Sequence, residues 1–438
     1  MKKIVLFAAL LCATLSAGAQ EKAWSLHDCI EYALSHNLKV KQTALQVEQR
    51  EIDLNTAKSN ILPGVSASAS ENLSFGRGLT ADNTYANTNT TSTGFSLGAD
   101  MTLFKGLRNK NNIELSKLNL KAATQDLEKA RDDIRLAVAQ AYVQVLYKME
   151  INQVALRQVE IDSQQVVRLS ELRDNGKAAQ ADVAVQEATL AQSRLTAVQA
   201  EHALRLAELD LVQLLDLPTP VGFSVQIPEK GEPELPSVSP NDIFEEAVGS
   251  KPVVQAQAIR VAYAERNIAL AKGGYLPTLS LSGGLGTNYY TNSGSTSAKF
   301  LDQLSSNFSQ YVGLSLSIPI FSRMSNRNQV RSAKINHQTQ QLQLDQTKKD
   351  LFKEIQQAWY NAVAAYRKFE SSKDAEKAAI ESFSLVQAKY ENGKATITEF
   401  NESKNQYLKA SSDLAQARYE AMYQAELLDY YRGIEMEL

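Results

Sequence analysis

The sequence predicts an α+β membrane fold in which short β-hairpins are joined to very long α-helical hairpins. Three observations lead to this prediction. Two segments alternate apolar and polar residues with the two-residue period of a strand. Residues 107–215 contain a single glycine, Gly176, and no proline. The whole pattern occurs twice along the chain, so each kind of hairpin is expected twice.

The duplication is visible in the alignment of the chain with itself. Residues 25–70 align without gaps on 239–284, and the match resumes at residue 94. Matched positions are Pro63 with Pro277, Phe104 with Phe321, and Tyr142 with Trp359. Solenoid repeats have periods of about 20 to 50 residues, so this longer period indicates a duplicated domain. The expected divisions are a first repeat at 20–216, a proline-rich linker at 217–241 and a second repeat at 242–438.

Residues 1–19 have the pattern of a cleaved secretory signal. Lys2 and Lys3 precede an apolar run, and small residues stand at 17–19. Cleavage after residue 19 leaves 44 basic and 49 acidic residues, a net charge of −5, which offers no basic surface to nucleic acid. Only Cys29 then remains, and the four histidines are too scattered for a metal site. We therefore expect an exported protein without nucleic acid, metal or cofactor.

The residues between 107 and 215 favour a helical hairpin that turns at 173–178, because Ala, Leu, Gln, Glu, Lys and Arg predominate. Its first arm would be roughly 100 Å long at ~1.5 Å per residue. The return arm has two apolar seams on either side of a charged stripe, which indicates neighbours on two sides, as in a cylinder. The first seam is Val183, Leu190, Ala197, Leu204 and Leu211, and the second is Ala184, Ala191, Val198 and Val212. An ordinary antiparallel coiled coil is the alternative that remains open here.

Strand alternation is clearest at 95–103 and at the matching segment 312–320. Weaker alternation occurs at 65–73 and 279–285. Segments of about 9 to 11 residues can cross a bilayer as tilted strands. The intervening residues, 74–93 and 286–310, are rich in Asn, Thr, Ser and Gly, and we expect them to be long extracellular loops. After the signal no run of about 18 apolar residues exists, which excludes a transmembrane helix.

Four strands cannot close a barrel in a membrane. Small closed barrels use about eight strands, and an open sheet edge in lipid would leave backbone groups unpaired. The chain is therefore expected to oligomerise in order to insert into a bilayer, although these residues do not fix the number of copies.

Several short motifs recur in both halves in the same order. The chain opens with a helix at Ser25–Leu34 followed by His36-Asn37. The paired motifs are Leu62-Pro63 with Leu276-Pro277, and Leu103-Phe104-Lys105-Gly106 with Ile320-Phe321-Ser322. In this combination the sequence resembles the TolC family of outer-membrane efflux and secretion proteins over nearly the whole mature chain. The resemblance implies a homotrimer in the Gram-negative outer membrane, with a twelve-stranded barrel continued by a periplasmic α-helical barrel.

The resemblance also implies partners and docking residues. The family's partners are a periplasmic adaptor, also called a membrane fusion protein, and an inner-membrane pump. The hairpin tips that would meet the adaptor contain Gly176, Lys177, Gly393 and Lys394. The alternative reading is that each Asn-Gly pair only supplies the left-handed backbone of a tight turn.

Four residues match positions that narrow the inner mouth of the tunnel in the family. They are Asp182, Glu399, Glu402 and Tyr390. Alternatively, Thr396 and Glu399 form a capping box, Asp182 favours a helix N-terminus, and Tyr390 packs. Glu402 lies beyond a cap's reach. Ala181 and Ala395 stand where relatives have polar or basic residues, so a latch at those positions is not expected.

The sequence thus predicts an exit duct that passes substrates from pump and adaptor to the exterior. No nucleophile motif, phosphate-binding loop or converging His and carboxylate set is present, so no catalytic residues are expected. A periplasmic coiled-coil scaffold without a barrel is the alternative function.

Overall fold

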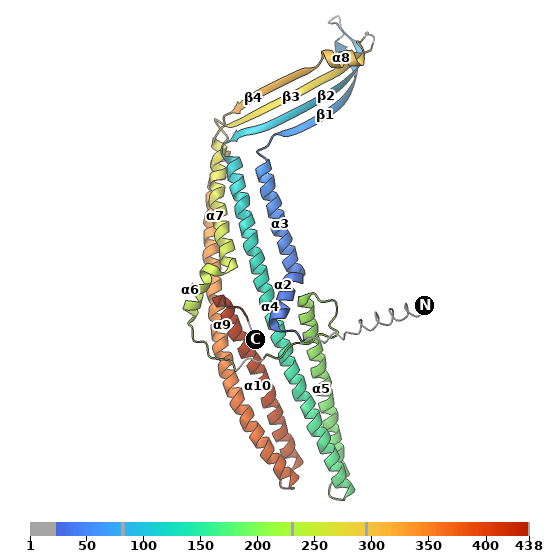
Figure 1. The fold of residues 1–438 in the computed structure, drawn as a ribbon, viewed down its shortest axis with the longest axis vertical. Coiled ribbons are helices and arrows are strands. Elements are labelled where there is room, and N and C mark those ends of the chain that lie inside the picture. The colour runs from blue at the N-terminus through green and yellow to red at the C-terminus, as the bar shows by residue number, and fades with distance from the viewer. Residues whose placement is uncertain (1–22, 80–83, 229–231, 294–296, 437–438) are drawn as a thin grey trace, which may run out of the picture. The chain divides into compact units, whose positions relative to one another are not determined.

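The computed structural model describes residues 23–79, 84–228, 232–293 and 297–436 (Figure 1). The predicted signal at 1–19 lies outside these residues. The chain divides into two compact units. The helical unit contains the described residues up to Ala44 together with Asp126–Gln255 and Gln346 onward, and the sheet unit contains Leu45–Gln125 and Ala256–Asp345.

The two halves of the chain have the same order of main elements, and within the described residues the second half adds η1 and α8. The first half has α2 (Leu26–His36), α3 (Leu38–Ser59), β1 (Gly64–Leu79), β2 (Tyr85–Lys105), α4 (Arg108–Asp174) and α5 (Gln180–Leu215). The second has α6 (Pro240–Ser250), α7 (Pro252–Lys272), η1 (Gly273–Tyr275), β3 (Thr278–Asn292), α8 (Phe300–Ser306), β4 (Ser309–Ser317), α9 (Ser325–Glu391) and α10 (Ile397–Arg432). Helices α4 and α9 have 67 residues each, and α5 and α10 have 36 each.

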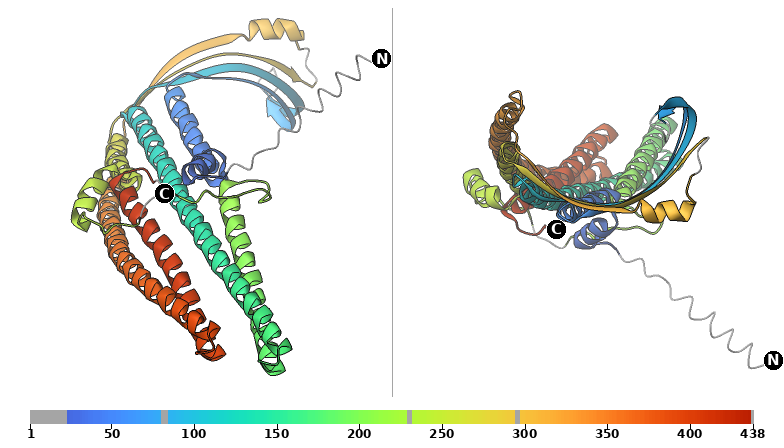
Figure 2. Two further views of the ribbon diagram at one scale, coloured as in Figure 1. Left: turned by 60° about the horizontal axis from the view of Figure 1, so that its bottom comes forward. Right: turned by 90° about the horizontal axis from the view of Figure 1, so that it is seen from above.

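The sheet is antiparallel with the order β1-β2-β3-β4, and its strands curve together (Figure 2). β1, β2 and β3 are longer than predicted, and the predicted loop at 74–93 is wrong. Residues 74–79 pair with 85–90, for example Arg77 with Asn87. Thr88, Thr90, Thr91 and Thr93 are β-branched and favour the extended backbone, so cross-strand pairing prevails over the polar composition.

The second predicted loop, 286–310, is also partly strand. β3 continues to Asn292, and α8 lies beyond it. The Gln303 side chain of α8 accepts from the Tyr290 N–H at 2.9 Å and donates to the Tyr290 carbonyl at 2.9 Å. β4 ends at Ser317 rather than 320, because Pro319 has no N–H for the ladder.

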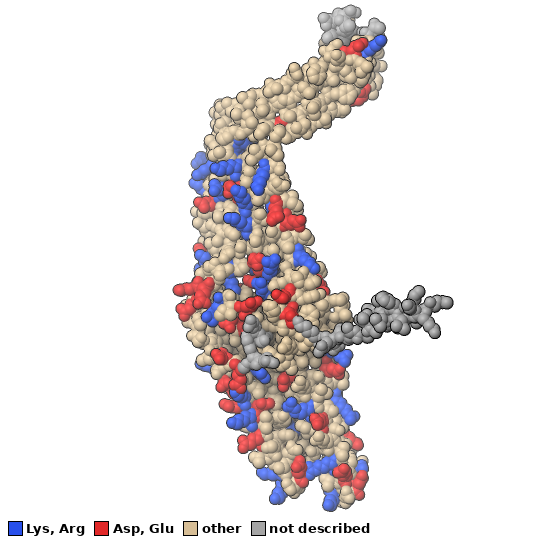
Figure 3. Space-filling model, in the orientation of Figure 1, with Lys and Arg blue, Asp and Glu red and all other residues tan. Residues whose placement is uncertain are grey.

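Charged side chains are few on the strands and frequent on the helices (Figure 3). The charged strand residues are Glu71, Arg77, Asp100 and Lys105, and the sequences of β3 and β4 contain none. This distribution suits strands that contact lipid on one face.

Within the described residues, no helix has a stretch that is long and apolar enough to cross a membrane.

The predicted first seam of α5 forms core in the helical unit. Val183 and Leu211 are fully buried. In the second predicted seam Ala184, Ala191 and Val198 are exposed in the single chain, whereas Val212 is only 2% exposed and belongs to the core. In the other hairpin, one buried cluster consists of Ala365, Phe369, Ala417 and Ala421. The hairpins are therefore packed internally and retain an apolar outer stripe.

The segment between α5 and α6 is held by two matched aromatic residues. Trp24 and Val225 form a parallel bridge, and the Tyr142 hydroxyl donates to the carbonyls of Trp24 at 3.1 Å and Gln226 at 2.6 Å. The Trp359 indole, which matches Tyr142 in the self-alignment, donates to the Val238 carbonyl at 2.9 Å. One aromatic side chain from each half, Tyr142 or Trp359, therefore holds this segment by hydrogen bonds to its backbone.

Cys29 provides a test of the packing of α2. Its side chain is fully buried, and burial next to Asp28 raises the pKa of the thiol to about 12. We expect iodoacetamide at mild alkaline pH to leave the folded protein unmodified and to alkylate it once denatured, as measured by mass spectrometry. Ser237→Cys in a Cys29→Ala background places an exposed thiol between α5 and α6 as a control. Rapid alkylation of Cys29 in the folded protein would show that α2 is not packed as described.

Candidate functional site

The α4–α5 hairpin ends in a turn that Gly176 makes possible. The Lys177 N–H donates to the Leu172 carbonyl at 2.8 Å, and the Gly176 N–H donates to the Arg173 carbonyl at 2.8 Å. These two bonds define a Schellman cap, whose residue after the helix adopts a left-handed backbone. Gly176 has φ +71°, and the space around it is open. The turn geometry therefore accounts for the glycine.

The α9–α10 hairpin ends in the same way. Lys394 donates to the Lys389 carbonyl at 2.8 Å, and Gly393, with φ +67°, donates to the Tyr390 carbonyl at 3.0 Å. Lys177 and Lys394 are exposed, and neither makes an ion pair within the part of the chain that the structure describes. The turn at each tip therefore presents a lysine that has no ion-pair partner among the described residues.

Two of the predicted mouth carboxylates cap the returning helices. The Asp182 carboxylate accepts from the Ala179 N–H at 3.3 Å. Glu399 accepts from the Thr396 N–H at 2.6 Å, while the Thr396 hydroxyl accepts from the Glu399 N–H at 3.2 Å. The Thr396 hydroxyl also donates to the Glu399 carboxylate at 2.9 Å, and the two bonds from the N–H and the hydroxyl of Thr396 lower the pKa of Glu399. The capping interpretation thus describes a real contact, and a role of either residue at a channel mouth stays a prediction.

Glu402 is exposed one turn after Glu399 and makes no hydrogen bond or ion pair among the described residues. No local structural role accounts for this carboxylate.

Tyr390 joins the two hairpins. Its ring packs on Phe400 with centroids 5.0 Å apart, and the Arg168 guanidinium of α4 lies 4.9 Å from the ring centroid. Arg168 also donates to the Glu391 carbonyl at 2.9 Å. Burial raises the pKa of the Tyr390 hydroxyl, and nearby Asp182 raises it further. The contacts of Arg168 with Tyr390 and Glu391 therefore join α4 of one hairpin to α9 of the other.

A buried polar cluster that sequence reasoning missed ties the hairpins together farther from the tips. Asp162 of α4 is fully buried and forms an ion pair with Lys404 of α10, whose side chain is 1% exposed. From α5, Ser193 donates to the same carboxylate, and Gln186 donates to it at 3.3 Å. One carboxylate therefore links three helices of both hairpins.

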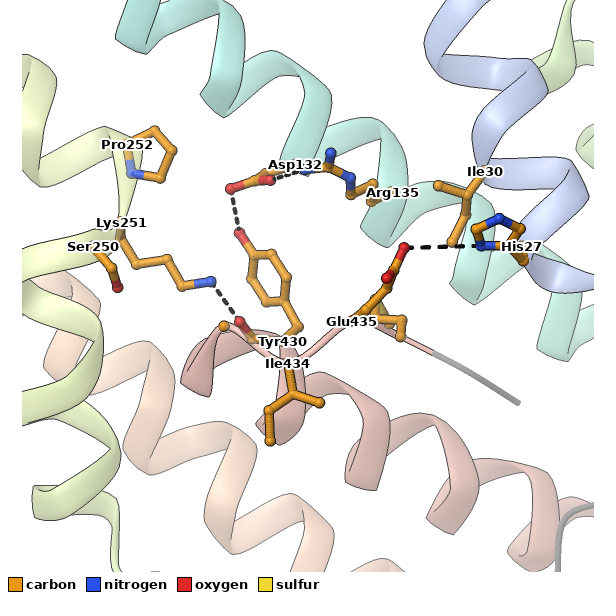
Figure 4. A pocket seen from close by; sticks show the side chains of 12 residues that line it. His27, Ile30, Asp132, Arg135, Ser250, Lys251, Pro252, Tyr430, Ile434 and Glu435 are labelled. Carbon is orange, nitrogen blue, oxygen red and sulfur yellow. Dashed lines mark hydrogen bonds and ion pairs between the residues drawn. The ribbon is translucent and has the colours of Figure 1, made fainter.

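A pocket of about 380 Å³ lies where α2, α4, α10 and the α6–α7 junction meet (Figure 4). Lys251 donates to the Tyr430 carbonyl at 2.6 Å, and the Tyr430 hydroxyl donates to Asp132 at 3.2 Å. Arg135 pairs with Asp132 at 2.6 Å. Burial lowers the pKa of Lys251 to about 8. Because these polar groups already bind one another, the pocket is a structural junction rather than a ligand site.

A metal site finds no support in the described residues. They contain no cluster of His, Cys, Asp or Glu that could hold a metal ion. The arrangement instead consists of long hairpins with charged tips and a curved sheet with open edges.

Comparison with known proteins decides the family. The family described as Outer membrane efflux protein matches residues 29–216 and 243–429. The chain belongs to the outer membrane efflux protein family. This family consists of transport channels rather than enzymes, and membership confirms the predicted outer-membrane location and efflux function.

Relatives and solved structures agree with this membership. The outer membrane efflux protein BepC of Brucella suis biovar 1 (strain 1330) is 23% identical over 434 residues, covering 96% of this chain and 88% of the relative. The outer membrane protein TolC of Salmonella enteritidis is 25% identical over 408 residues, covering 91% and 79%.

Among solved structures, the outer membrane protein VceC of Vibrio cholerae has a TM-score of 0.75 at 18% identity, covering 94% of this chain and 97% of that chain. The Campylobacter jejuni CmeC outer membrane channel has a TM-score of 0.77 at 19% identity, covering 94% and 86%. The predicted fold class, with four strands and two long helical hairpins per chain, is thus confirmed for this efflux family member. The alternative of a scaffold without a barrel loses its support.

Proposed function

We propose that three copies of this chain form an exit duct that receives substrates from an inner-membrane pump through a periplasmic adaptor. The observation that carries the proposal is the open sheet, in which β1 and β4 each have one unpaired edge. In lipid an unpaired edge is costly because no water satisfies its N–H and C=O groups. Pairing β1 of one copy with β4 of the next removes both edges, and three copies give a twelve-stranded barrel.

Exposed apolar stripes on the helices of the sheet unit support the same assembly. Leu45 and Ile52 of α3 are 63% and 55% exposed, and Ile335 and Leu342 of α9 are 63% and 70% exposed. Each pair is seven residues apart, which is the spacing of a coiled-coil seam. A second copy of the chain suits both stripes, because the neighbouring strand edges require a second copy as well.

The duplicated pattern supports a division into repeats at 20–216 and 242–438 around a linker at 217–241. In this arrangement every subunit supplies one strand hairpin and one helical hairpin from each repeat.

The hairpin tips form the inner mouth of the duct in this proposal. Arg168 and Tyr390 hold the two tips together, and Asp182, Glu399 and Glu402 lie in the first two turns of the returning helices. Repeated in three copies, these carboxylates make the mouth negative and favour cations. The exposed turns with Gly176, Lys177, Gly393 and Lys394 meet the adaptor.

The charge at the mouth can be tested in planar bilayers. We expect Glu399→Gln with Glu402→Gln to lower the preference of the channel for potassium over chloride, because six carboxylates leave the proposed trimer. Glutamine retains an oxygen at position 399 that can accept from Thr396. Glu245→Gln, which removes an exposed carboxylate from α6, serves as the control. An unchanged reversal potential in the double variant, with intact conductance, would contradict the role of these residues.

A further inference from the structure

A polar groove lies in the sheet unit where the helices reach the sheet. Its volume is about 640 Å³, and α3, the end of β2, the start of α4 and α7 line it. Five asparagines contribute to this lining: Asn60, Asn109, Asn112, Asn119 and Asn267. Tyr263 of α7 contributes the one aromatic ring. Neutral amide groups thus predominate in the groove.

The side-chain amides of these five asparagines do not stabilise the fold through hydrogen bonds. None of their side chains makes a hydrogen bond among the described residues. Asn326, which matches Asn109 in the self-alignment, donates to the Gly274 carbonyl at 2.6 Å and so fixes the start of α9. Asn109 therefore lacks a hydrogen bond of the kind that Asn326 makes with Gly274, so this structural role does not explain the asparagine in the first half.

The groove is on the polar side of the sheet. Thr102 lines it and follows Ser96, Gly98 and Asp100 on one face of β2, whereas Phe95, Leu97, Ala99 and Met101 occupy the other face. Membrane barrels turn their polar face inward. In the duct proposed above, on which this step rests, the groove therefore opens toward the passage.

The charges in the groove do not favour an ionic ligand. Lys105 is its one cation, and the Asp53 carboxylate already pairs with Arg50 at 2.9 Å. A primary amide offers both donors and an acceptor, which complements hydroxyl groups that also donate and accept. An aromatic ring beside such amides supplies an apolar face for the C–H groups of a sugar ring.

We propose that this groove is a wall site for neutral, hydroxyl-rich cargo, namely saccharides. It holds them briefly during passage through amide–hydroxyl hydrogen bonds. A transport channel requires weak binding, because cargo must enter and also leave. Exposed amides that exchange water for hydroxyl groups meet this requirement.

Single-channel recording of the whole oligomer with maltohexaose tests the proposal. We expect brief current interruptions that last longer than those caused by polyethylene glycol of equal hydrodynamic size. Asn112→Ala with Asn119→Ala and Asn267→Ala should shorten the maltohexaose interruptions about tenfold, because each lost hydrogen bond weakens binding modestly. Asn55→Ala removes an exposed amide of α3 outside the groove and should leave the interruptions unchanged.

Two results would overturn the wall site while leaving the duct intact. One is equal interruption times for maltohexaose and polyethylene glycol in a conducting channel. The other is a triple variant that conducts normally and keeps the long maltohexaose interruptions. A folded oligomer that forms no channel at all would instead contradict the proposed function.

Discussion

Lys404→Met is expected to lower the free energy of unfolding of the protein by about 3 to 5 kcal/mol, the usual cost of breaking a buried ion pair from one side. Lys404 and Asp162 are 1% and 0% exposed, so methionine would leave a carboxylate in the core without its cation. Methionine has nearly the volume of the lysine stem, which limits any contribution from a cavity. The expected loss is therefore electrostatic.

A double variant separates the electrostatic effect from general damage to packing. Asp162→Asn with Lys404→Met removes both charges. The asparagine oxygen can still accept from Ser193, and its amide N–H can donate to the buried Gln186 carbonyl oxygen, which has no partner in the described residues. We expect the double variant to regain more than half of the lost stability, because replacing both partners of a buried pair is often close to neutral. Guanidinium unfolding in detergent, followed by far-ultraviolet circular dichroism, measures the difference.

Lys368→Met provides the matched control. Lys368 pairs with Glu420 between α9 and α10 at 2.8 Å, but the two side chains are 47% and 45% exposed. Solvent screens such a pair, so its loss should cost at most about 1 kcal/mol. If Lys404→Met is no more harmful than Lys368→Met, or if the double variant is no better than the single one, the buried pair does not have the stated role.

Leu45→Glu with Ile52→Glu is expected to abolish the oligomer. Burying a leucine or isoleucine contributes about 1.5 to 3 kcal/mol, and every interface in a ring would lose both residues and gain two charges. The monomer should tolerate the change, because both side chains are more than half exposed in it. Size-exclusion chromatography with light scattering in detergent measures the mass of the assembly.

Glu51→Gln with Lys58→Gln is the control on the same helix. At 3.6 residues per turn these exposed residues lie on a different face of α3 from Leu45 and Ile52. We expect this variant to keep the mass of the native oligomer. A stable oligomer of the Leu45→Glu, Ile52→Glu variant would show that the stripe on α3 is not an interface.

The opening helix and the first arm of the long hairpin were predictable to within about two residues because their limits depend on local chemistry, whereas α8 lies in a predicted loop. The first arm was expected at 107–172 and runs from Arg108 to Asp174, where the Asn175-Gly176 turn ends it. The strands were not predictable in length. Whether Thr90 or Asn89 lies in a loop or a ladder depends on partners in β1 and β3, which are distant in the chain. Polar composition alone could not separate the two cases.

The candidate site divides in the same way. The cap formed by Thr396 and Glu399 is readable because the two residues are three positions apart. Asp162 and Lys404 are 242 positions apart, and each resembles an ordinary solvated charge. A weak signal did exist, since Asp162 lies seven residues from both Ala155 and Leu169, which are buried in α4. A carboxylate at the seven-residue spacing of buried side chains predicts a buried partner of opposite charge.

The ion pair between Asp162 and Lys404 also has a mechanical consequence, because its two residues are not repeated at the matching positions of the other half of the chain. In the self-alignment Asp162 matches Ala379, and Lys404 matches Glu187, so the reciprocal pair cannot form. A ring of three such chains would have six boundaries between neighbouring hairpins, and this buried ion pair would occur at the three boundaries within chains. A force that separates all neighbouring hairpins equally would therefore be opposed more strongly at the boundaries within chains than at those between chains. The boundaries between chains would separate first, and the mouth would widen by movement of three pairs of hairpins, one pair from each chain, rather than of six separate hairpins.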